Sequence, residues 1–338
     1  MKSTIILLVT LLSMMTVALH LGYDPDSGQL TDLTEDSYTR HTTDGTLKAV
    51  ISLPEHGWVY ASPSGNYLVL AKFHLEMLPL VADLRFLDSK GNEVWSKQGY
   101  PFASARLSDD GKVATVEFLG TGPQSVAELS LLDANGATIT TRSIHPLGEY
   151  RFSPDGSLFA YNVPGDGLVV LNAETGKDLV SLPSTQVFAL TSERVITAQS
   201  NSVTLHNLAD GEEFTIETGV NIPRFVIPSG NAFVVAGRDD LFVVSPDDLT
   251  ERYTRLSEGY SIASLDATGD FSLIAIGTYT REGSGAIWLY DGELNQLEEV
   301  LLPESRLGGP TPQVVLSDGG RFWVKTPDEV LTFEREVE

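Results

Sequence analysis

The stretch Ser153-Pro154-Asp155-Gly156 decides the fold of this 338-residue chain, together with the largely apolar run at 157–163 that follows it. In such a turn, proline fixes φ at the second position, aspartate bonds the local backbone, and glycine accepts a positive φ. A second apolar run at 168–171 leads into another turn at 172–176. The stretch therefore predicts short β-strands joined by tight turns.

The same unit recurs along the chain. Together with the turn at 153, comparable turns begin at residues 62, 108, 191, 227, 266 and 317. In chain order, the distances from the start of one turn to the start of the next are 46, 45, 38, 36, 39 and 51 residues. This spacing scatters around the period of roughly 40–50 residues typical of β-propeller blades. We therefore predict an all-β fold, a single seven-bladed β-propeller over residues 45–338. Counts of six or eight blades stay open, because the units at 191 and 227 are degenerate.

The last of these units contains only two strands, which bears on how the ring closes. An unpaired strand edge is a liability that proteins avoid. The strand-like segment 46–53 precedes the first turn and has no other place in the repeat. We expect this N-terminal strand to complete the last blade and close the ring.

The N-terminus has the features of an export signal. Lys2 precedes an apolar run at 5–21, and acidic residues follow it from Asp24 onward. A short positive region before an apolar segment is typical of a signal peptide, although the run is also close to the length of a membrane-spanning helix. We expect a signal peptide or N-terminal anchor at 1–23, an acidic linker at 24–44, and a periplasmic or extracellular location.

Composition excludes some classes of partner. Lys and Arg number 22 and Asp and Glu 46, which gives a formal net charge of -24. Nucleic acids and anionic membrane surfaces need clustered basic residues, so we expect neither as a partner, apart from the N-terminal anchor. The chain has no cysteine, which excludes disulfides and thiolate metal sites.

The repeat resembles the WD40-like and YVTN-type bacterial propellers, and the Ser-Pro-Asp-Gly turn at 153–156 is similar to that of TolB-type repeats. Val94-Trp95 after the turn at 88–91 is also similar to repeats of outer-membrane assembly lipoproteins and quinoprotein propellers. The Trp-Asp and Gly-His pairs of eukaryotic WD40 repeats do not occur. The resemblance covers about residues 45–338 and implies architecture, because function varies widely on this fold.

No sequence motif indicates catalysis. The chain lacks His-Glu-x-x-His, Gly-x-Ser-x-Gly and Walker sequences, and its six histidines show no metal-ligand spacing. We therefore expect a binding protein rather than an enzyme, with no cofactor and no bound metal. A propeller enzyme of the lactonase or cyclase kind, with a site at the channel mouth, is the alternative that a bound metal would favour.

Two arginines stand at equivalent positions of adjacent units. Arg106 and Arg151 each precede a turn by two residues, in the strand expected to lie nearest the ring axis. They could form a clamp for an anion or a carboxylate. They could equally form ion pairs, for example with Glu149 or Asp109.

Long, variable loops are expected on the face opposite the Ser-Pro-Asp-Gly turns, and loops on a rigid ring usually carry binding residues. Aromatic, apolar and arginine side chains in these loops are of the types enriched at interfaces. With the two arginines, the candidate binding residues are His74, Met77, Leu78, Tyr100, Phe102, Arg106, Arg151, Tyr279, Arg281 and Arg306. We expect an exported scaffold that binds an envelope or extracellular protein or peptide. A scaffold like the outer-membrane assembly factors is a further alternative.

Overall fold

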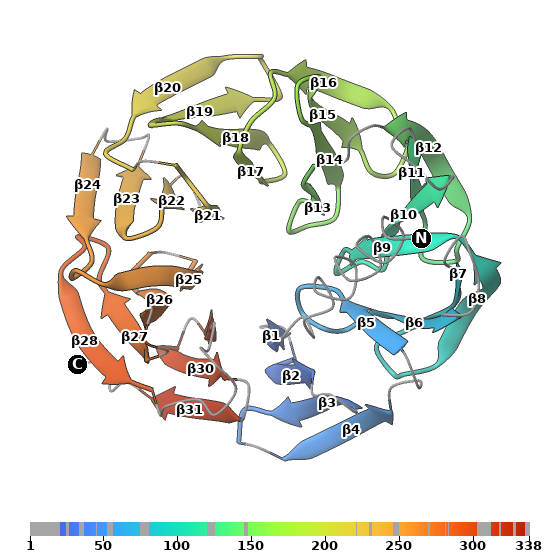
Figure 1. The fold of residues 1–338 in the computed structure, drawn as a ribbon, viewed down its shortest axis with the longest axis horizontal. Coiled ribbons are helices and arrows are strands. Elements are labelled where there is room, and N and C mark those ends of the chain that lie inside the picture. Colours follow the sequence, from blue (N-terminus) through green and yellow to red (C-terminus); the bar gives the residue numbers. More distant parts are fainter. Residues whose placement is uncertain are drawn as a thin grey trace, which may run out of the picture.

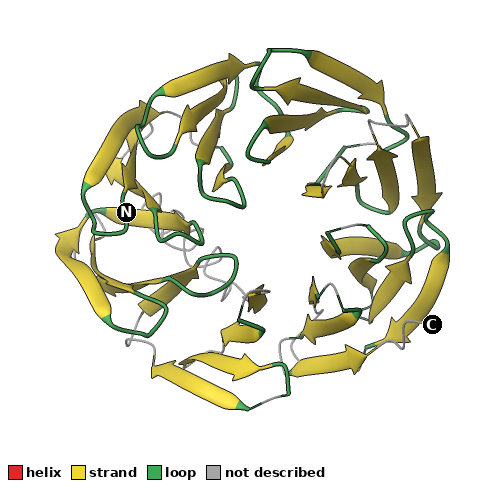
Figure 2. Cartoon of the chain, turned by 180° about the vertical axis from the view of Figure 1, so that it is seen from behind, coloured by secondary structure: helices red, strands yellow, loops and turns green. Residues whose placement is uncertain are grey.

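The strands form eight four- or three-stranded sheets arranged as the blades of a ring (Figure 1). This computed structural model describes residues 21–338 apart from 25–26, 34–36, 45, 53–56, 75–80, 120–125, 145–147, 221, 230–231, 246–249, 270, 281, 283, 303–311, 318, 327–328 and 335–338. The described residues contain strands, turns and loops and no helix, as the view from behind in Figure 2 also shows.

Each blade is built from consecutive strands, numbered outward from the ring axis. Blades 1 and 2 contain β1 (Leu21–Asp24), β2 (Gln29–Leu33), β3 (Ser37–Thr42), β4 (Leu47–Ser52), β5 (Gly57–Ala61), β6 (Leu68–His74), β7 (Val81–Leu87) and β8 (Glu93–Tyr100). Blades 3 and 4 contain β9 (Phe102–Leu107), β10 (Val113–Leu119), β11 (Val126–Leu132), β12 (Thr138–Ile144), β13 (Tyr150–Phe152), β14 (Leu158–Val163), β15 (Gly167–Asn172) and β16 (Asp178–Leu182).

The second half of the ring repeats this order, except in its last blade. Blades 5 and 6 contain β17 (Val187–Leu190), β18 (Arg194–Gln199), β19 (Ser202–Asn207), β20 (Glu213–Glu217), β21 (Phe225–Ser229), β22 (Ala232–Ala236), β23 (Asp240–Ser245) and β24 (Thr250–Arg255). Blade 7 contains β25 (Tyr260–Ala267), β26 (Ile274–Thr280), β27 (Gly285–Tyr290) and β28 (Gln296–Leu301), and blade 8 contains β29 (Gln313–Leu316), β30 (Arg321–Lys325) and β31 (Val330–Glu334).

The position of a strand in its blade explains its sequence. Middle strands such as β14 and β27 are buried at every position, because they are sandwiched between two neighbouring blades. They are accordingly apolar on both faces. Outermost strands such as β20 and β28 are exposed at most positions and carry charged residues.

The core is divided among the interfaces between blades. Eight apolar clusters correspond to the eight pairs of neighbouring blades. The cluster between blades 8 and 1 is the smallest, with Leu21, Leu30 and Trp323 as its buried members. Most interfaces are thus held by extensive apolar packing, and this last one is held differently.

The first blade corrects two predictions. Residues 24–44, expected to be a linker, contain the last residue of β1 and all of β2 and β3. The segment 46–53, expected to complete the last blade, contains β4, which pairs with β3. The preferred count of seven blades is therefore wrong, and the structure has eight, one of the two counts left open as alternatives. Blade 1 was missed because its strands bury polar residues, Thr31, Asp32 and Arg40 among them, instead of an alternating apolar face.

The ring closes between blades 8 and 1 through side chains. The backbone N–H of Leu21 donates to Gln313 Oε1 (3.0 Å), and Gln313 Nε2 donates to the Leu21 carbonyl (3.1 Å). Tyr23 stacks on Trp323 at a centroid distance of 5.0 Å. Among the described residues, no strand is shared between the two blades.

Blade 7 departs from the turn chemistry of blades 2, 3 and 4. Its first turn was predicted at 266–269, but the hydrogen bond from Phe271 N–H to the Thr268 carbonyl places it at 268–271. Phe271 has a φ of 56°, and Leu294 in the second turn has a φ of 59°. Both side chains are buried between blades 6 and 7, so apolar burial compensates for the strained backbone.

Candidate functional site

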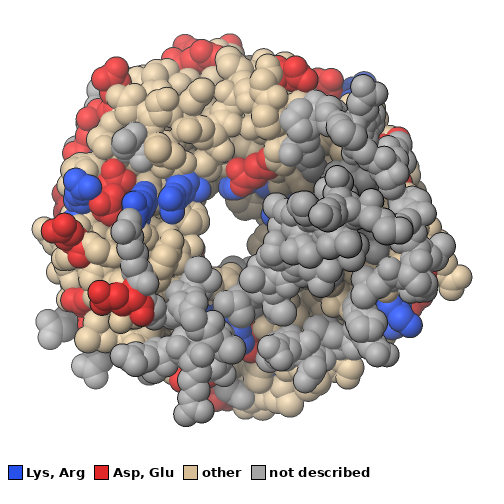
Figure 3. Space-filling model, viewed as in Figure 1, with Lys and Arg blue, Asp and Glu red and all other residues tan. Residues whose placement is uncertain are grey.

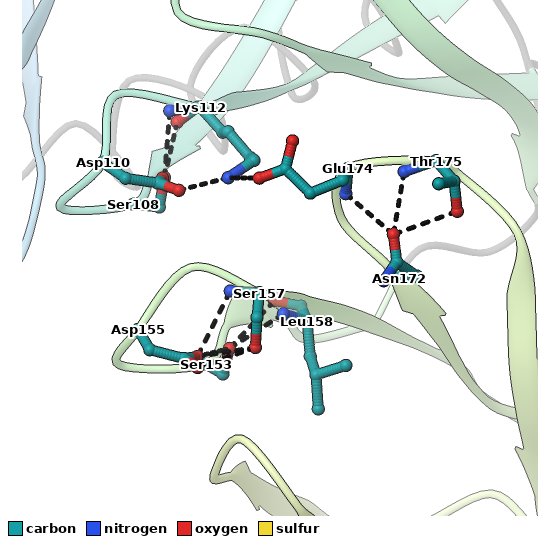
Figure 4. Close-up of polar contacts among 10 residues, drawn as sticks. All are labelled: Ser108, Asp110, Lys112, Ser153, Asp155, Ser157, Leu158, Asn172, Glu174 and Thr175. Carbon is teal, nitrogen blue, oxygen red and sulfur yellow. Dashed lines mark hydrogen bonds and ion pairs between the residues drawn. The ribbon is translucent and has the colours of Figure 1, made fainter.

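The Ser-Pro-Asp-Gly turn that revealed the repeat satisfies its own polar groups (Figure 4). Ser153 Oγ donates to Asp155 Oδ1 (2.6 Å) and accepts from the Leu158 backbone N–H (2.9 Å). Ser157 donates to both carboxylate oxygens of Asp155 (2.8 Å each). These contacts fix the hairpin between β13 and β14, and they give this turn a structural role.

Lys112 ties blade 3 to blade 4 on the same face of the ring (Figure 4). Its side chain is 7% exposed, and its ammonium contacts Asp110 and lies 2.6 Å from Glu174 Oε1. Burial alone would lower the pKa of Lys112, but hydrogen bonds to these two carboxylates outweigh it, so the pKa is raised. This cation is fully engaged within the protein.

Arg106 and Arg151 lie on the innermost strands β9 and β13, which border the central opening of the ring (Figure 1). Figure 3 shows this opening in the space-filling view, with basic and acidic side chains at its edge. The Arg106 guanidinium lies 5.6 Å from the ring centroid of Tyr150, and the Arg151 guanidinium lies 5.2 Å from that of Phe188. Each arginine therefore stacks on an aromatic side chain of the following blade, which orients its planar head group.

The charges around this pair are unbalanced. Arg151 forms an ion pair with Glu149, one of the two partners anticipated from the sequence. The other, Asp109, instead accepts hydrogen bonds from the Ser64 N–H (2.9 Å) and hydroxyl (2.6 Å). Arg106 is exposed and has no ion pair with any carboxylate of the described residues. Burial, and then the neighbouring charge of Arg106, lower the pKa of Arg151 to about 10.

The other predicted binding residues are dispersed. His74 Nε2 lies 3.0 Å from Asp83 Oδ2. Phe102 is 2% exposed and packs against Tyr60 and Phe73 in the core between blades 2 and 3. Tyr279 is half-buried in β26. Met77, Leu78, Arg281 and Arg306 lie outside the described residues.

Tyr100 belongs to a cluster that sequence reasoning missed. Its hydroxyl donates to Glu117, and Lys97 Nζ lies 4.8 Å from its ring centroid. Glu117 is 8% exposed and stands directly opposite Glu128 in the register of β10 and β11. Burial, and then the charge of Glu128, raise the pKa of Glu117 to about 7. The signal available in the sequence was a single charged residue, Glu117, in a segment at 113–119 that is apolar apart from it and Thr115.

The described part of the chain contains neither a metal-binding cluster nor a membrane-spanning helix. No group of three or more His, Asp or Glu side chains there is arranged to hold a metal ion. Nor does that part contain a helix long and apolar enough to cross a membrane.

Comparison with known proteins identifies the class of this chain. No family model matches it, and no curated protein matches it. Solved structures do: BamB from Moraxella catarrhalis has a TM-score of 0.63 at 13% identity, covering 94% of this chain and 96% of that one. The C-terminal WD40 domain of Sif2 gives 0.64 at 12% identity, covering 92% and 93%. The computationally designed Ika8 protein gives 0.65 at 12% identity, covering 93% and 95%.

These similarities extend over nearly the whole chain at low identity, so they show the fold. The chain is an eight-bladed β-propeller repeat protein, and its fold is similar to that of BamB and of the Sif2 WD40 domain. Its activity has to be argued from its own side chains.

Proposed function

We propose that this chain is an exported propeller scaffold that binds a carboxylate-bearing segment of an envelope or extracellular protein at its central opening. The observation that carries the proposal is the pair Arg106 and Arg151, two guanidinium groups on adjacent innermost strands. Among the described residues, Glu149 pairs with Arg151, and Arg106 has no carboxylate partner. In a chain of net charge -24, a local excess of positive charge is the feature that needs explanation.

The chemistry of the pair suits a carboxylate. A guanidinium group donates two parallel hydrogen bonds to a carboxylate, and stacking on an aromatic ring leaves its N–H edges free to do so. Tyr150, under Arg106, is itself held by a hydrogen bond of 2.7 Å between its hydroxyl and that of Ser104. A bound carboxylate would also relieve the repulsion between the two arginines.

The acidity of the whole chain does not oppose such a ligand at close range. At physiological ionic strength the Debye length is about 8 Å, so carboxylates on the outer strands are largely screened from the ring axis. The contact with Arg106 and Arg151 is screened much less, because the ligand and the arginines would touch.

The N-terminus and the fold support export. Lys2 and residues 5–20 of the apolar run precede the first described strand in the sequence. That strand begins at Leu21, so residues 21–23 of the segment expected to be a signal or anchor belong to the propeller instead. Fractionation of the native cell tests this part of the proposal, and protein confined to the cytosol would contradict it.

A defined peptide tests binding at the arginine pair. We expect a short peptide rich in Asp and Glu to bind the wild-type protein, and the Arg106→Gln/Arg151→Gln variant to bind it at least about tenfold more weakly, because charged hydrogen bonds are lost. Isothermal titration calorimetry measures both affinities.

Two controls make the result specific. The same peptide with Asn and Gln in place of Asp and Glu should not bind. Arg142→Gln removes an arginine that pairs with Asp178 (2.9 Å) on the outer strands, and it should leave the affinity unchanged. Equal binding by wild type and the double variant, or equal binding of the two peptides, would contradict the proposal.

A further inference from the structure

The eighth blade has one strand fewer than the others. Seven blades contain four strands, whereas blade 8 consists of β29, β30 and β31 among the described residues. The third strand of the other blades is covered by a fourth, as β27 is by β28, and β27 is buried throughout. In β31, by contrast, Val330, Leu331 and Phe333 are only half-buried and Thr332 is exposed.

The outer edge of β31 lacks the devices that protect the other edges. Five of the seven fourth strands contain a register shift against their neighbour: β4, β8, β12, β16 and β28. Such bulges, like charged residues, discourage a further strand from pairing. β31 pairs with β30 in a continuous register, and its sequence Val-Leu-Thr-Phe-Glu contains no Lys, Arg or Pro. Its single charged residue, Glu334, is the last of the strand.

The register identifies which backbone groups face outward. The Thr326 N–H donates to the Glu329 carbonyl at the start of the β30–β31 hairpin (2.9 Å). Because hydrogen-bonded pairs alternate along an antiparallel ladder, Leu331 and Phe333 bond to β30, and the N–H and C=O of Val330 and Thr332 point away from it. These outward groups are the ones that an added strand would meet.

Apolar side chains are exposed on both sides of the short blade. β28 of blade 7 exposes Leu301 (71%), and β4 of blade 1 exposes Leu47 (53%) and Val50 (54%). These are the three most exposed large apolar side chains on the described outer strands. In Figure 1, β31 lies on the rim of the ring between β28 and β4.

We propose that the edge of β31 receives an extended segment of a partner protein, which adds to blade 8 as its fourth strand. Strand addition of this kind takes its affinity from main-chain hydrogen bonds and its specificity from alternate side chains. Apolar residues at alternate positions suit Leu301, Leu47 and Val50, and intervening Lys or Arg residues suit Glu298 and Glu299 of β28. The partner segment is therefore amphipathic, basic and extended. This site is separate from the arginine pair.

A synthetic peptide of alternating Val and Lys residues tests the proposal. We expect saturable binding to wild type and to Thr332→Ala, and at least about tenfold weaker binding to Thr332→Pro, because proline removes an outward N–H and its ring obstructs the edge. Fluorescence anisotropy of the labelled peptide gives the affinities, and a thermal melt checks that each variant is folded.

A second arm of the experiment does not depend on the proline variant. The same peptide with N-methyl groups on alternate residues cannot complete the ladder, and it should lose binding to the wild-type protein. The Arg106→Gln/Arg151→Gln variant should bind the unmodified peptide normally, so the two proposed sites fail or succeed independently. Equal binding to Thr332→Pro and Thr332→Ala, or of methylated and unmethylated peptide, would overturn the proposal.

Hydrogen exchange in the free protein tests for other occupants of the edge. The Thr332 amide should exchange quickly in the free protein and slowly when the peptide is bound. Slow exchange in the free protein at every concentration would mean that this chain's own residues 1–20 cover the edge. Slow exchange that depends on protein concentration would mean that a second copy does. Either result would overturn the proposal.

Discussion

At the scale of single residues, Glu117 has the most distinctive environment. Its carboxyl group is buried in β10 opposite Glu128, and burial, followed by that neighbouring charge, raises its pKa to about 7. An unfolded glutamate titrates near 4.3, so between about pH 4.5 and 7 the folded state retains a proton that the unfolded state has lost. Stability therefore falls as pH rises through this window and levels off above it.

Glu117→Gln should remove this pH dependence. At pH 5 the variant and the wild type should have similar free energies of unfolding, because the wild-type carboxyl is then protonated. At pH 8 the variant should be more stable by up to about 3 kcal/mol, since it no longer buries an ionised group. Urea unfolding at the two pH values measures the difference. Glu298→Gln, on the exposed strand β28, should be neutral at both, and an equal gain from both variants would contradict the assignment.

At the scale of elements, the first turn of blade 2 shows why its glycine is needed. Gly65 has a φ of 73°, and its carbonyl accepts hydrogen bonds from Tyr38 (2.9 Å) and Arg40 (3.1 Å) of blade 1. A Cβ atom at this position would overlap Tyr38 and Thr31. The turn is therefore both a strand reversal and the contact on which blade 1 docks.

A pair of Gly→Ala substitutions separates these two roles. Gly211 has nearly the same φ, 75°, with open space around its Cβ position, so Gly211→Ala should cost only the backbone strain of about 1 kcal/mol. Gly65→Ala adds overpacking of a further 1–3 kcal/mol or so. Thermal and urea unfolding compare the two variants. Equal losses would show that blade 1 does not dock closely on this turn.

The turns were the part of the fold that could be predicted from the sequence. Ser-x-x-Gly at 62, 108 and 153 predicts hairpins from local chemistry alone, and these hairpins are present. The turn at 268–271 was displaced in the prediction because Phe271 occupies the position that glycine has elsewhere. The fold tolerates the positive φ of Phe271 because the side chain is buried between two blades. The local sequence does not predict that burial.

The candidate site was harder to predict from the sequence than the turns were. The equivalence of Arg106 and Arg151 could be read from the repeat, and the structure places both on innermost strands. Phe102, expected in a loop, is buried instead, because its segment continues into β9 and meets blade 2. The position of a side chain relative to the next blade depends on contacts between distant residues.

At the scale of the whole molecule, the ring has one seam, between blades 8 and 1. Its apolar cluster is the smallest of the eight, and no strand crosses it among the described residues. A buried ion pair between Lys325 Nζ and Asp32 Oδ1 (2.8 Å) lies there, with the two side chains 5% and 11% exposed. Asp32 shows why blade 1 was not predicted from the sequence, because the ion-pair partner of Asp32, Lys325, lies almost three hundred residues away in the chain.

Breaking this ion pair should open the seam. Lys325→Ala leaves the Asp32 carboxylate buried without its cation, which costs about 3–5 kcal/mol. Asp32→Asn/Lys325→Met, which has no buried charge, should recover most of that loss. The exposed Lys48→Ala serves as the control for removing a lysine from this acidic chain, and it should change stability by less than about 0.5 kcal/mol.

Hydrogen exchange locates the effect of Lys325→Ala within the ring. Amides of β1, β2, β29 and β30 should lose protection first, while those of β14 and β18 on the far side keep theirs, because the seam can open before the other interfaces. Uniform loss of protection around the ring would mean that the blades unfold as one cooperative unit. The seam would then be as strong as the other seven interfaces, despite its small apolar cluster.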